Sequence, residues 1–235
     1  MKKNLVVFDI DGTLTLGDGL GTRCFFAALE GVLGATGVDR RLEAYAESTD
    51  GGIAHEVARN LLGREATVAE LDQVRSVYLA SLTDAVAAAP RAYRPVAGAD
   101  RILSATIATG EWSVAVATGN WRGAAHLKLR CAGIQAPDTL ATAEDGTSRA
   151  QVLAVARARA AVRPGIDQRV VYVGDQPWDL RAARELGIGF LGIGQGERAK
   201  RLTQGGALVI GDYTDCASFL RLLAEVASAT PPWVS

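Results

Sequence analysis

The chain has 235 residues, of which 49 % are hydrophobic and 22 % are charged, so it is long and apolar enough to form a buried core. Its formal net charge is -1 at pH 7 and no basic stripe stands out, so we expect no nucleic-acid partner. The three cysteines are scattered, and no apolar run approaches the ~18 residues of a membrane span. The N-terminus also lacks a signal-peptide pattern. We therefore expect a cytoplasmic protein without a membrane partner.

The first predicted element is a buried strand at Leu5–Phe8, a short apolar run that an aspartate ends. Residues 17–95 contain no convincing strand. Ile53, Val57 and Leu61 recur at four-residue spacing, and Val68–Ala89 has the pattern of one long helix. Glycines near residue 17 and prolines near residue 95 suit a pair of hinges. We therefore expect an α-helical segment inserted after the first strand.

The rest of the chain alternates between predicted strands and helices. The strands are expected at Val114–Ala117, Val170–Val173, Phe190–Ile193 and Ala207–Ile210. The helices are expected at Arg122–Ala132, Ala150–Ala161, Leu180–Leu186 and Glu197–Thr203. This order predicts an α/β fold with a doubly wound, Rossmann-like parallel sheet. We expect residues 1–16 and 96–229 to form this core domain and residues 230–235 to form a frayed tail.

Two aspartates follow the first strand, in Asp9-Ile-Asp11-Gly-Thr13. Burying two like charges is costly, but a cation beside them removes that objection. A carboxylate next to Mg²⁺ stays ionised and can attack phosphorus, which suits Asp9. A second carboxyl group, Asp11, can protonate the leaving oxygen and then deprotonate water. Gly12 lets the backbone bend so that both acids reach one pocket.

This pattern resembles the haloacid dehalogenase superfamily, and the resemblance covers nearly the whole chain. The first motif of that family, DxDGT, matches residues 9–13. Its second motif, a hydroxyl residue that ends a strand, matches Thr118 in Thr118-Gly119-Asn120. A hydroxyl group and backbone amides before a helix form a cradle for phosphoryl oxygens. The resemblance implies that Thr118, Gly119 and Asn120 bind the phosphoryl group, together with Gly12 and Thr13.

The fourth motif of the family, GDxxxD, resembles residues 174–179. Mg²⁺ prefers near-octahedral oxygen ligands. The resemblance implies that Mg²⁺ is the cofactor, held by the carboxylates of Asp9 and Asp175 and by the main-chain carbonyl of Asp11. Asp179 is then expected to hold a water molecule of the metal shell.

The third motif is where this chain departs from the family, which generally has a lysine that bridges the nucleophile and the phosphate. Arg149 falls at about the expected place, 31 residues after Thr118. An arginine can hold a carboxylate and a phosphate at once, so it is chemically competent. Lys128 is the alternative, although it is ten residues beyond Thr118 in the following helix. We favour Arg149 for this role.

The inserted segment, residues 17–95, resembles the helical cap domain of phosphoglycolate phosphatase-like and β-phosphoglucomutase-like members. In such relatives a turn like Thr49-Asp50 faces the active site and helps to select the substrate; the alternative for this turn is a helix cap. The resemblance implies a Mg²⁺-dependent phosphatase that hydrolyses a small phosphorylated metabolite through an aspartyl-phosphate on Asp9. A phosphomutase shares every core motif and stays an alternative, as does a catalytically silent phosphate-binding module. We expect a monomer or a weak homodimer.

Overall fold

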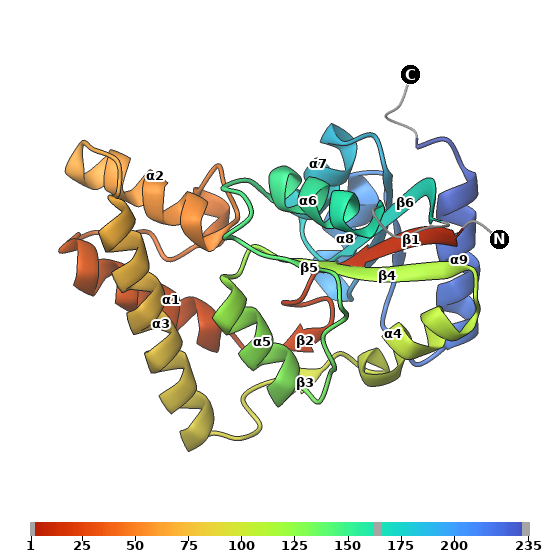
Figure 1. The fold of residues 1–235 in the computed structure, drawn as a ribbon, viewed down its shortest axis with the longest axis horizontal. Coiled ribbons are helices and arrows are strands. Elements are labelled where there is room, and N and C mark those ends of the chain that lie inside the picture. The colour runs from red at the N-terminus through yellow and green to blue at the C-terminus, as the bar shows by residue number, and fades with distance from the viewer. Residues whose placement is uncertain (1–2, 162–165, 232–235) are drawn as a thin grey trace.

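The computed structural model describes residues 3–161 and 166–231, which form a parallel sheet flanked by helices and a separate group of helices (Figure 1). The strands of this sheet follow the order β5-β4-β1-β6-β7-β8, and every pair is parallel. Their bounds are Lys3–Phe8 for β1, Trp112–Ala117 for β4, Leu140–Ala141 for β5, Ile166–Gly174 for β6, Gly189–Ile193 for β7 and Leu208–Ile210 for β8. The predicted doubly wound α/β fold is confirmed.

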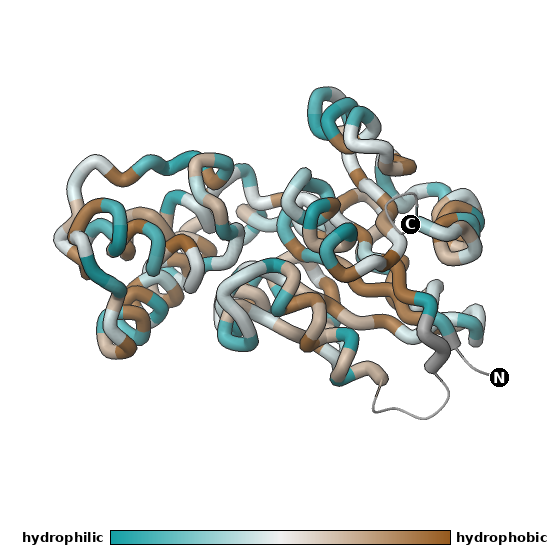
Figure 2. Tube along the Cα trace, turned by 90° about the horizontal axis from the view of Figure 1, so that it is seen from above, coloured by the Kyte–Doolittle hydropathy of each residue, from teal (hydrophilic) through white to brown (hydrophobic). Residues whose placement is uncertain are grey.

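Helices cover both faces of the sheet. Because both faces are buried, successive side chains along a strand pack alternately into two apolar clusters. In β1, Val6 and Phe8 pack in one cluster, while Leu5 and Val7 pack in the other. Brown, hydrophobic stretches of the chain accordingly run through the interior of the sheet part in Figure 2. The helices are α4 at Ala99–Ala108, α5 at Arg122–Cys131, α6 at Arg149–Ala161, α7 at Pro177–Glu185, α8 at Gly196–Gln204 and α9 at Cys216–Ser228.

The inserted segment forms a helical group to one side of the sheet (Figure 1). It contains α1 at Leu20–Leu33, a short 3-10 helix at Leu42–Ala44, α2 at Asp50–Leu62 and α3 at Val68–Ala88. Two-residue strands, β2 at Thr15–Leu16 and β3 at Arg94–Pro95, pair antiparallel where the chain leaves the sheet and where it returns. The two connections of the proposed cap domain, residues 17–95, therefore lie side by side.

The helical group and helix α5 share one apolar cluster. Phe25 of α1 and Tyr78 of α3 pack around Trp121, which directly precedes α5, with ring centroids 5.7–6.3 Å apart. Ala124 and Leu127 of α5 belong to the same cluster. Because aromatic rings bury large apolar areas, this contact holds the helical group against the sheet part of the molecule.

Most predicted elements are present, with bounds that differ by a few residues. The expectation of no strand within residues 17–95 was wrong at Arg94–Pro95, where two residues pair across the connection. The helices at residues 53–61 and 68–89 are confirmed, but Leu61 and Val77 are 44 % and 42 % exposed and do not belong to the buried stripes. In the expected tail, residues 232–235 lie outside the described residues. Among the residues that are described, no helix is long and apolar enough to cross a membrane.

Candidate active site

Three neighbouring strands of the sheet end at one edge with the predicted site residues. Asp9 directly follows β1, Thr118 follows β4 and Asp175 follows β6. Because the carboxyl ends of parallel strands open into a common crevice, these strand ends meet at one cavity, which Asp9 and Asp175 line. The cavity has a volume of about 450 Å³ and lies between the sheet edge and the helical group. The expected site residues that line it are Asp9, Asp11, Gly12, Asp50, Gly119, Asn120, Lys128, Arg149 and Asp175.

Gly12 forms the sharp bend that the sequence predicts after β1. Its φ of +79° lies in the left-handed region, where a side chain is strained. A Cβ atom at this position would lie 2.1 Å from Oδ2 of Asp175, so no larger residue fits. The bend returns through a hydrogen bond from the Gly12 N–H to the Thr15 carbonyl. It brings the loop of Asp9 and Asp11 against the loop of Asp175.

Asp9 is 3 % exposed and pairs with a single guanidinium group. Nη1 of Arg149 donates to Oδ1 of Asp9 at 2.9 Å, and Nε of Arg149 lies 3.4 Å from Oδ1 of Asp179. Burial raises the pKa of Asp9 to about 7, although the charge of Arg149 opposes this shift. Of the two third-motif candidates, Arg149 is therefore the one that contacts Asp9.

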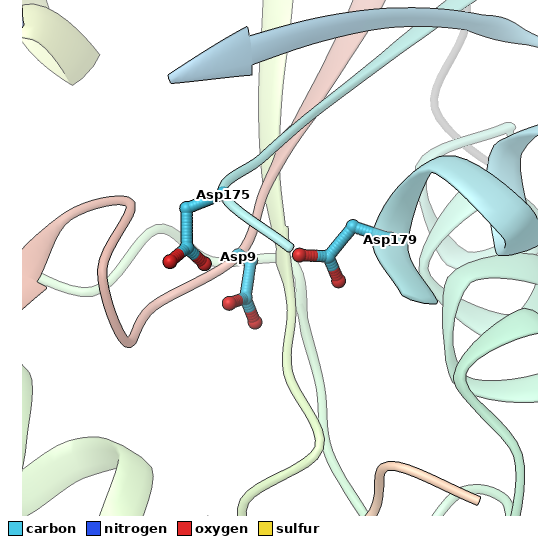
Figure 3. A group of neighbouring side chains, drawn as sticks. All are labelled: Asp9, Asp175 and Asp179. Atoms are coloured by element: carbon cyan, nitrogen blue, oxygen red, sulfur yellow. The ribbon is translucent and has the colours of Figure 1, made fainter. Parts of the chain in front are cut away.

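Asp9, Asp175 and Asp179 offer three carboxylates to one point (Figure 3). One oxygen atom of each lies within 4.8 Å of the others, and all three side chains are buried. Burial raises the pKa of Asp175 and of Asp179, and Oδ1 of Asp175 has no hydrogen-bond partner among the described residues. Three buried carboxylates with an unpartnered oxygen fit a hard divalent cation such as Mg²⁺, which binds oxygen ligands.

Asp11 faces a different cation. Nζ of Lys128 donates to Oδ2 of Asp11 at 2.6 Å, and Nδ2 of Asn120 donates to the same oxygen at 2.6 Å. Burial lowers the pKa of Lys128, but the Asp11 carboxylate together with Tyr78 and Tyr93 outweighs this effect, so the pKa lies well above its usual value and the ammonium group stays charged. Asp9 and Asp11 therefore occupy separate electrostatic environments although they are two residues apart.

Thr118 and Thr13 are completely buried and do not line the cavity. Oγ1 of Thr118 accepts hydrogen bonds from the backbone N–H and from Nδ2 of Asn120, at 3.3 and 2.8 Å. Oγ1 of Thr13 has no partner among the described residues. Of the residues expected to bind the phosphoryl group, Gly12, Gly119 and Asn120 line the cavity.

Thr49 and Asp50 differ in their surroundings. Oγ1 of Thr49 accepts from the Gly52 N–H and donates to the Thr147 carbonyl, so this buried hydroxyl group caps α2. Asp50 lines the cavity, and its Oδ2 accepts from the Trp121 N–H at 2.8 Å. Burial raises the pKa of Asp50 to about 7, which the charge of Lys128 opposes. Of the predicted turn, Asp50 is the residue placed to meet a ligand.

Comparison with known proteins decides the family. A family model described as haloacid dehalogenase-like hydrolase matches residues 6–184, which include every expected site residue. The chain belongs to the haloacid dehalogenase-like hydrolase family. No curated protein sequence matches the chain.

Solved structures share the fold of this haloacid dehalogenase-like hydrolase at low sequence identity. A putative β-phosphoglucomutase from Bacteroides vulgatus is 18 % identical over 97 % of this chain and 91 % of its own, with a TM-score of 0.69. CbbY from Rhodobacter sphaeroides, in complex with xylulose-(1,5)-bisphosphate, is 17 % identical over 92 % and 96 %, with a TM-score of 0.67. A predicted phosphoglycolate phosphatase from Haemophilus somnus is 16 % identical over 94 % and 99 %, with a TM-score of 0.60.

Several cavity residues of this hydrolase were missed by the sequence analysis. Nη1 of Arg198 lies 2.9 Å from Oδ2 of Asp175, which also accepts from Nε2 of Gln176 at 2.7 Å. Arg40 and Arg41 line the cavity from the loop before α2. Arg198 follows β7 at the start of α8, so the rule that strand ends carry functional groups could have indicated it. Arg40 and Arg41 lie in an irregular loop, and no sequence pattern indicates them.

Proposed function

We propose that this protein is a Mg²⁺-dependent phosphatase that hydrolyses a small phosphorylated metabolite through an aspartyl-phosphate on Asp9. The observation that carries the proposal is the separation of the two N-terminal carboxylates. Asp9 is buried beside Arg149 and two further acids, whereas Asp11 is held by Lys128 with its side chain 43 % exposed. Two carboxyl groups in different environments suit two chemical roles.

In this mechanism Asp9 is the nucleophile. One of its oxygens forms a bond to phosphorus as the bond from phosphorus to the leaving oxygen breaks. Arg149, which touches Asp9, orients the nucleophile and balances charge on the phosphoryl oxygens. Gly119 and Asn120 contribute polar groups at the start of α5, where backbone N–H groups favour an anion. When bound, Mg²⁺ would neutralise charge on the phosphoryl group, held by Asp9, Asp175 and the Asp11 carbonyl, with Asp179 nearby.

Asp11 is the general acid and then the general base. Its carboxyl group gives a proton to the leaving oxygen in the first step. Its carboxylate then takes a proton from the water molecule whose oxygen attacks phosphorus and releases Asp9. The partial exposure of Asp11 to the cavity supports this role, because both the leaving group and water must reach it.

A phosphomutase is the alternative function, and it differs only in the acceptor of the phosphoryl group. The fold shared with a putative β-phosphoglucomutase supports considering it. A silent phosphate-binding module is disfavoured because all four acids, Asp9, Asp11, Asp175 and Asp179, are present. A panel of phosphorylated metabolites assayed with Mg²⁺ separates the three: a phosphatase releases phosphate, a mutase forms an isomer, and a silent module does neither.

Replacing Arg149 with alanine is expected to lower kcat/KM by roughly 10²–10³-fold, the scale of losing one preorganised charge-stabilising group. The reason is its direct contact with Asp9 and its place in the cavity wall. Steady-state kinetics on the best substrate of the panel measures the effect, and the thermal unfolding midpoint checks the fold. Less loss in this variant than in Lys128→Ala would transfer the third-motif role to Lys128.

Replacing Asp50 with asparagine is expected to change the ranking of substrates in the panel, with shifts of several fold in KM. Asp50 lines the cavity, whereas Thr49 does not. A small aryl phosphate, which does not extend to α2, should be turned over normally. Thr49→Ala is the matched control and should cost about 1 kcal/mol of stability as a lost helix cap, with the ranking unchanged. A uniform loss across all substrates in Asp50→Asn would make Asp50 a structural residue instead.

A further inference from the structure

Lys128 is a buried cation in the cavity wall that the proposed chemistry of Asp9 does not use. Its side chain is 4 % exposed, and its Nζ donates to Oδ2 of Asp11 and, at 2.5 Å, to Oδ1 of Asn120. Asp9 pairs with Arg149 instead. Each cation therefore holds one of the two carboxylates, and Lys128 belongs to Asp11.

The bonds to Asp11 all converge on one of its two oxygens. Oδ2 accepts from Nζ of Lys128 and from Nδ2 of Asn120, which also donates to Oγ1 of Thr118. Oδ1 has no hydrogen bond among the described residues, and the Asp11 side chain is 43 % exposed and lines the cavity. A carboxylate fixed through one oxygen loses rotational freedom, so its second oxygen stays in a defined place.

The proposed cap domain packs around the same ammonium group. A Cβ atom on Gly21 of α1 would lie 2.7 Å from the hydroxyl oxygen of Tyr93 and 2.9 Å from Nζ of Lys128, so a larger residue there would push these side chains aside. The ring of Tyr93 lies on another side, with its centroid 5.8 Å from Nζ. Lys128 is thus enclosed by residues on both sides of the cavity, and its position depends on the helical group lying against α5.

We propose that Lys128 is a positioning residue for the general acid and base of this enzyme. It holds Oδ2 of Asp11 so that Oδ1 gives the proton to the leaving oxygen as the bond between phosphorus and that oxygen breaks. Oδ1 then takes a proton from water as the oxygen of that water bonds to phosphorus and Asp9 is released. Lys128 keeps its own proton throughout. This inference rests on the proposed function.

Rapid-quench measurement of Asp9 phosphorylation with two substrates tests the proposal, because phenyl phosphate needs a protonated leaving group and 4-nitrophenyl phosphate does not. Lys128→Met is expected to slow phosphoryl transfer from phenyl phosphate by about tenfold or more relative to 4-nitrophenyl phosphate. Lys128→Arg should restore part of the phenyl phosphate rate. Lys200→Met is the matched control, because Lys200 is exposed and, among the described residues, pairs only with Glu197 on its own helix; it should behave as wild type.

A double-mutant cycle measures whether Lys128 acts through Asp11, which a purely structural role of Lys128 would not require. If Lys128 acts through Asp11, Lys128→Met should have little further effect in the Asp11→Asn background. The proposal would be overturned if Lys128→Met slowed both substrates equally, or if the two substitutions had additive effects in the cycle. If the methionine variant does not fold, Lys128→Arg supplies the same test. Absence of a phosphorylated intermediate in the wild type would instead overturn the proposed function itself.

Discussion

Asp9→Asn is expected to reduce turnover by roughly 10⁴-fold or more, the scale observed when an enzyme loses its nucleophile. Among the described residues that line the cavity, the buried Asp9 is the carboxylate paired with Arg149, so no equivalent group replaces it. The asparagine has nearly the same shape, and the loss therefore reports chemistry rather than packing. Intact-mass analysis after rapid mixing with 4-nitrophenyl phosphate measures the adduct, which should vanish in this variant.

Asp11→Asn is the matched control for this experiment. It removes the group that exchanges protons but leaves Asp9 and Arg149 in contact, so a phosphorylated protein should still form with an activated leaving group. Its hydrolysis should slow by roughly the 10²–10⁴-fold that general acid–base catalysis supplies. An adduct mapped to any residue other than Asp9 would contradict the assignment.

Removing divalent metal is expected to abolish activity, because Asp9, Asp175 and Asp179 would then lie together without the divalent ion that their oxygens are proposed to bind. Burial raises the pKa of each of these acids, so without metal the nucleophile tends to take up a proton and lose its reactivity. Activity after dialysis against a chelator, followed by addition of Mg²⁺, measures the effect. Full activity in metal-free buffer would contradict the proposal.

Metal binding can be measured separately from activity by titration calorimetry. Asp175→Asn should weaken Mg²⁺ binding by at least about tenfold, because it removes a charged ligand. Arg198→Gln should act in the opposite direction, since the guanidinium group of Arg198 lies 2.9 Å from Oδ2 of Asp175 and competes with a cation for it. Weaker binding in both variants would indicate that Arg198 supports the site instead of competing with the ion.

The sequence predicted the residues whose positions depend on short-range structure. Asp9, Thr118 and Asp175 each follow an apolar run directly, and a parallel sheet brings the ends of neighbouring strands together. Family resemblance placed Arg149, and its contact with Asp9 agrees with that expectation. The two-residue strand β5 was missed because a pair of residues carries no periodic pattern.

The contacts that the sequence could not predict depend on how distant elements are oriented. Lys128 reaches Asp11 because α5 is oriented so that this side chain lines the cavity, and a spacing of ten residues from Thr118 does not reveal that orientation. Thr49 and Asp50 are adjacent, yet one caps a helix and the other faces the cavity. Their difference follows from how the start of α2 lies against Thr147 and Trp121, which tertiary packing determines.

The apolar cluster that α5 shares with the helical group has a consequence for folding cooperativity. Separating the two parts would expose Phe25, Tyr78 and Trp121 to water, which costs free energy in proportion to the apolar area uncovered. Neither part can then melt without destabilising the other. The chain should unfold in one transition, with amide protons of α1, α3 and α5 exchanging only through global opening. Phe25 and Tyr78, which also line the cavity, are thereby part of what keeps the molecule folded.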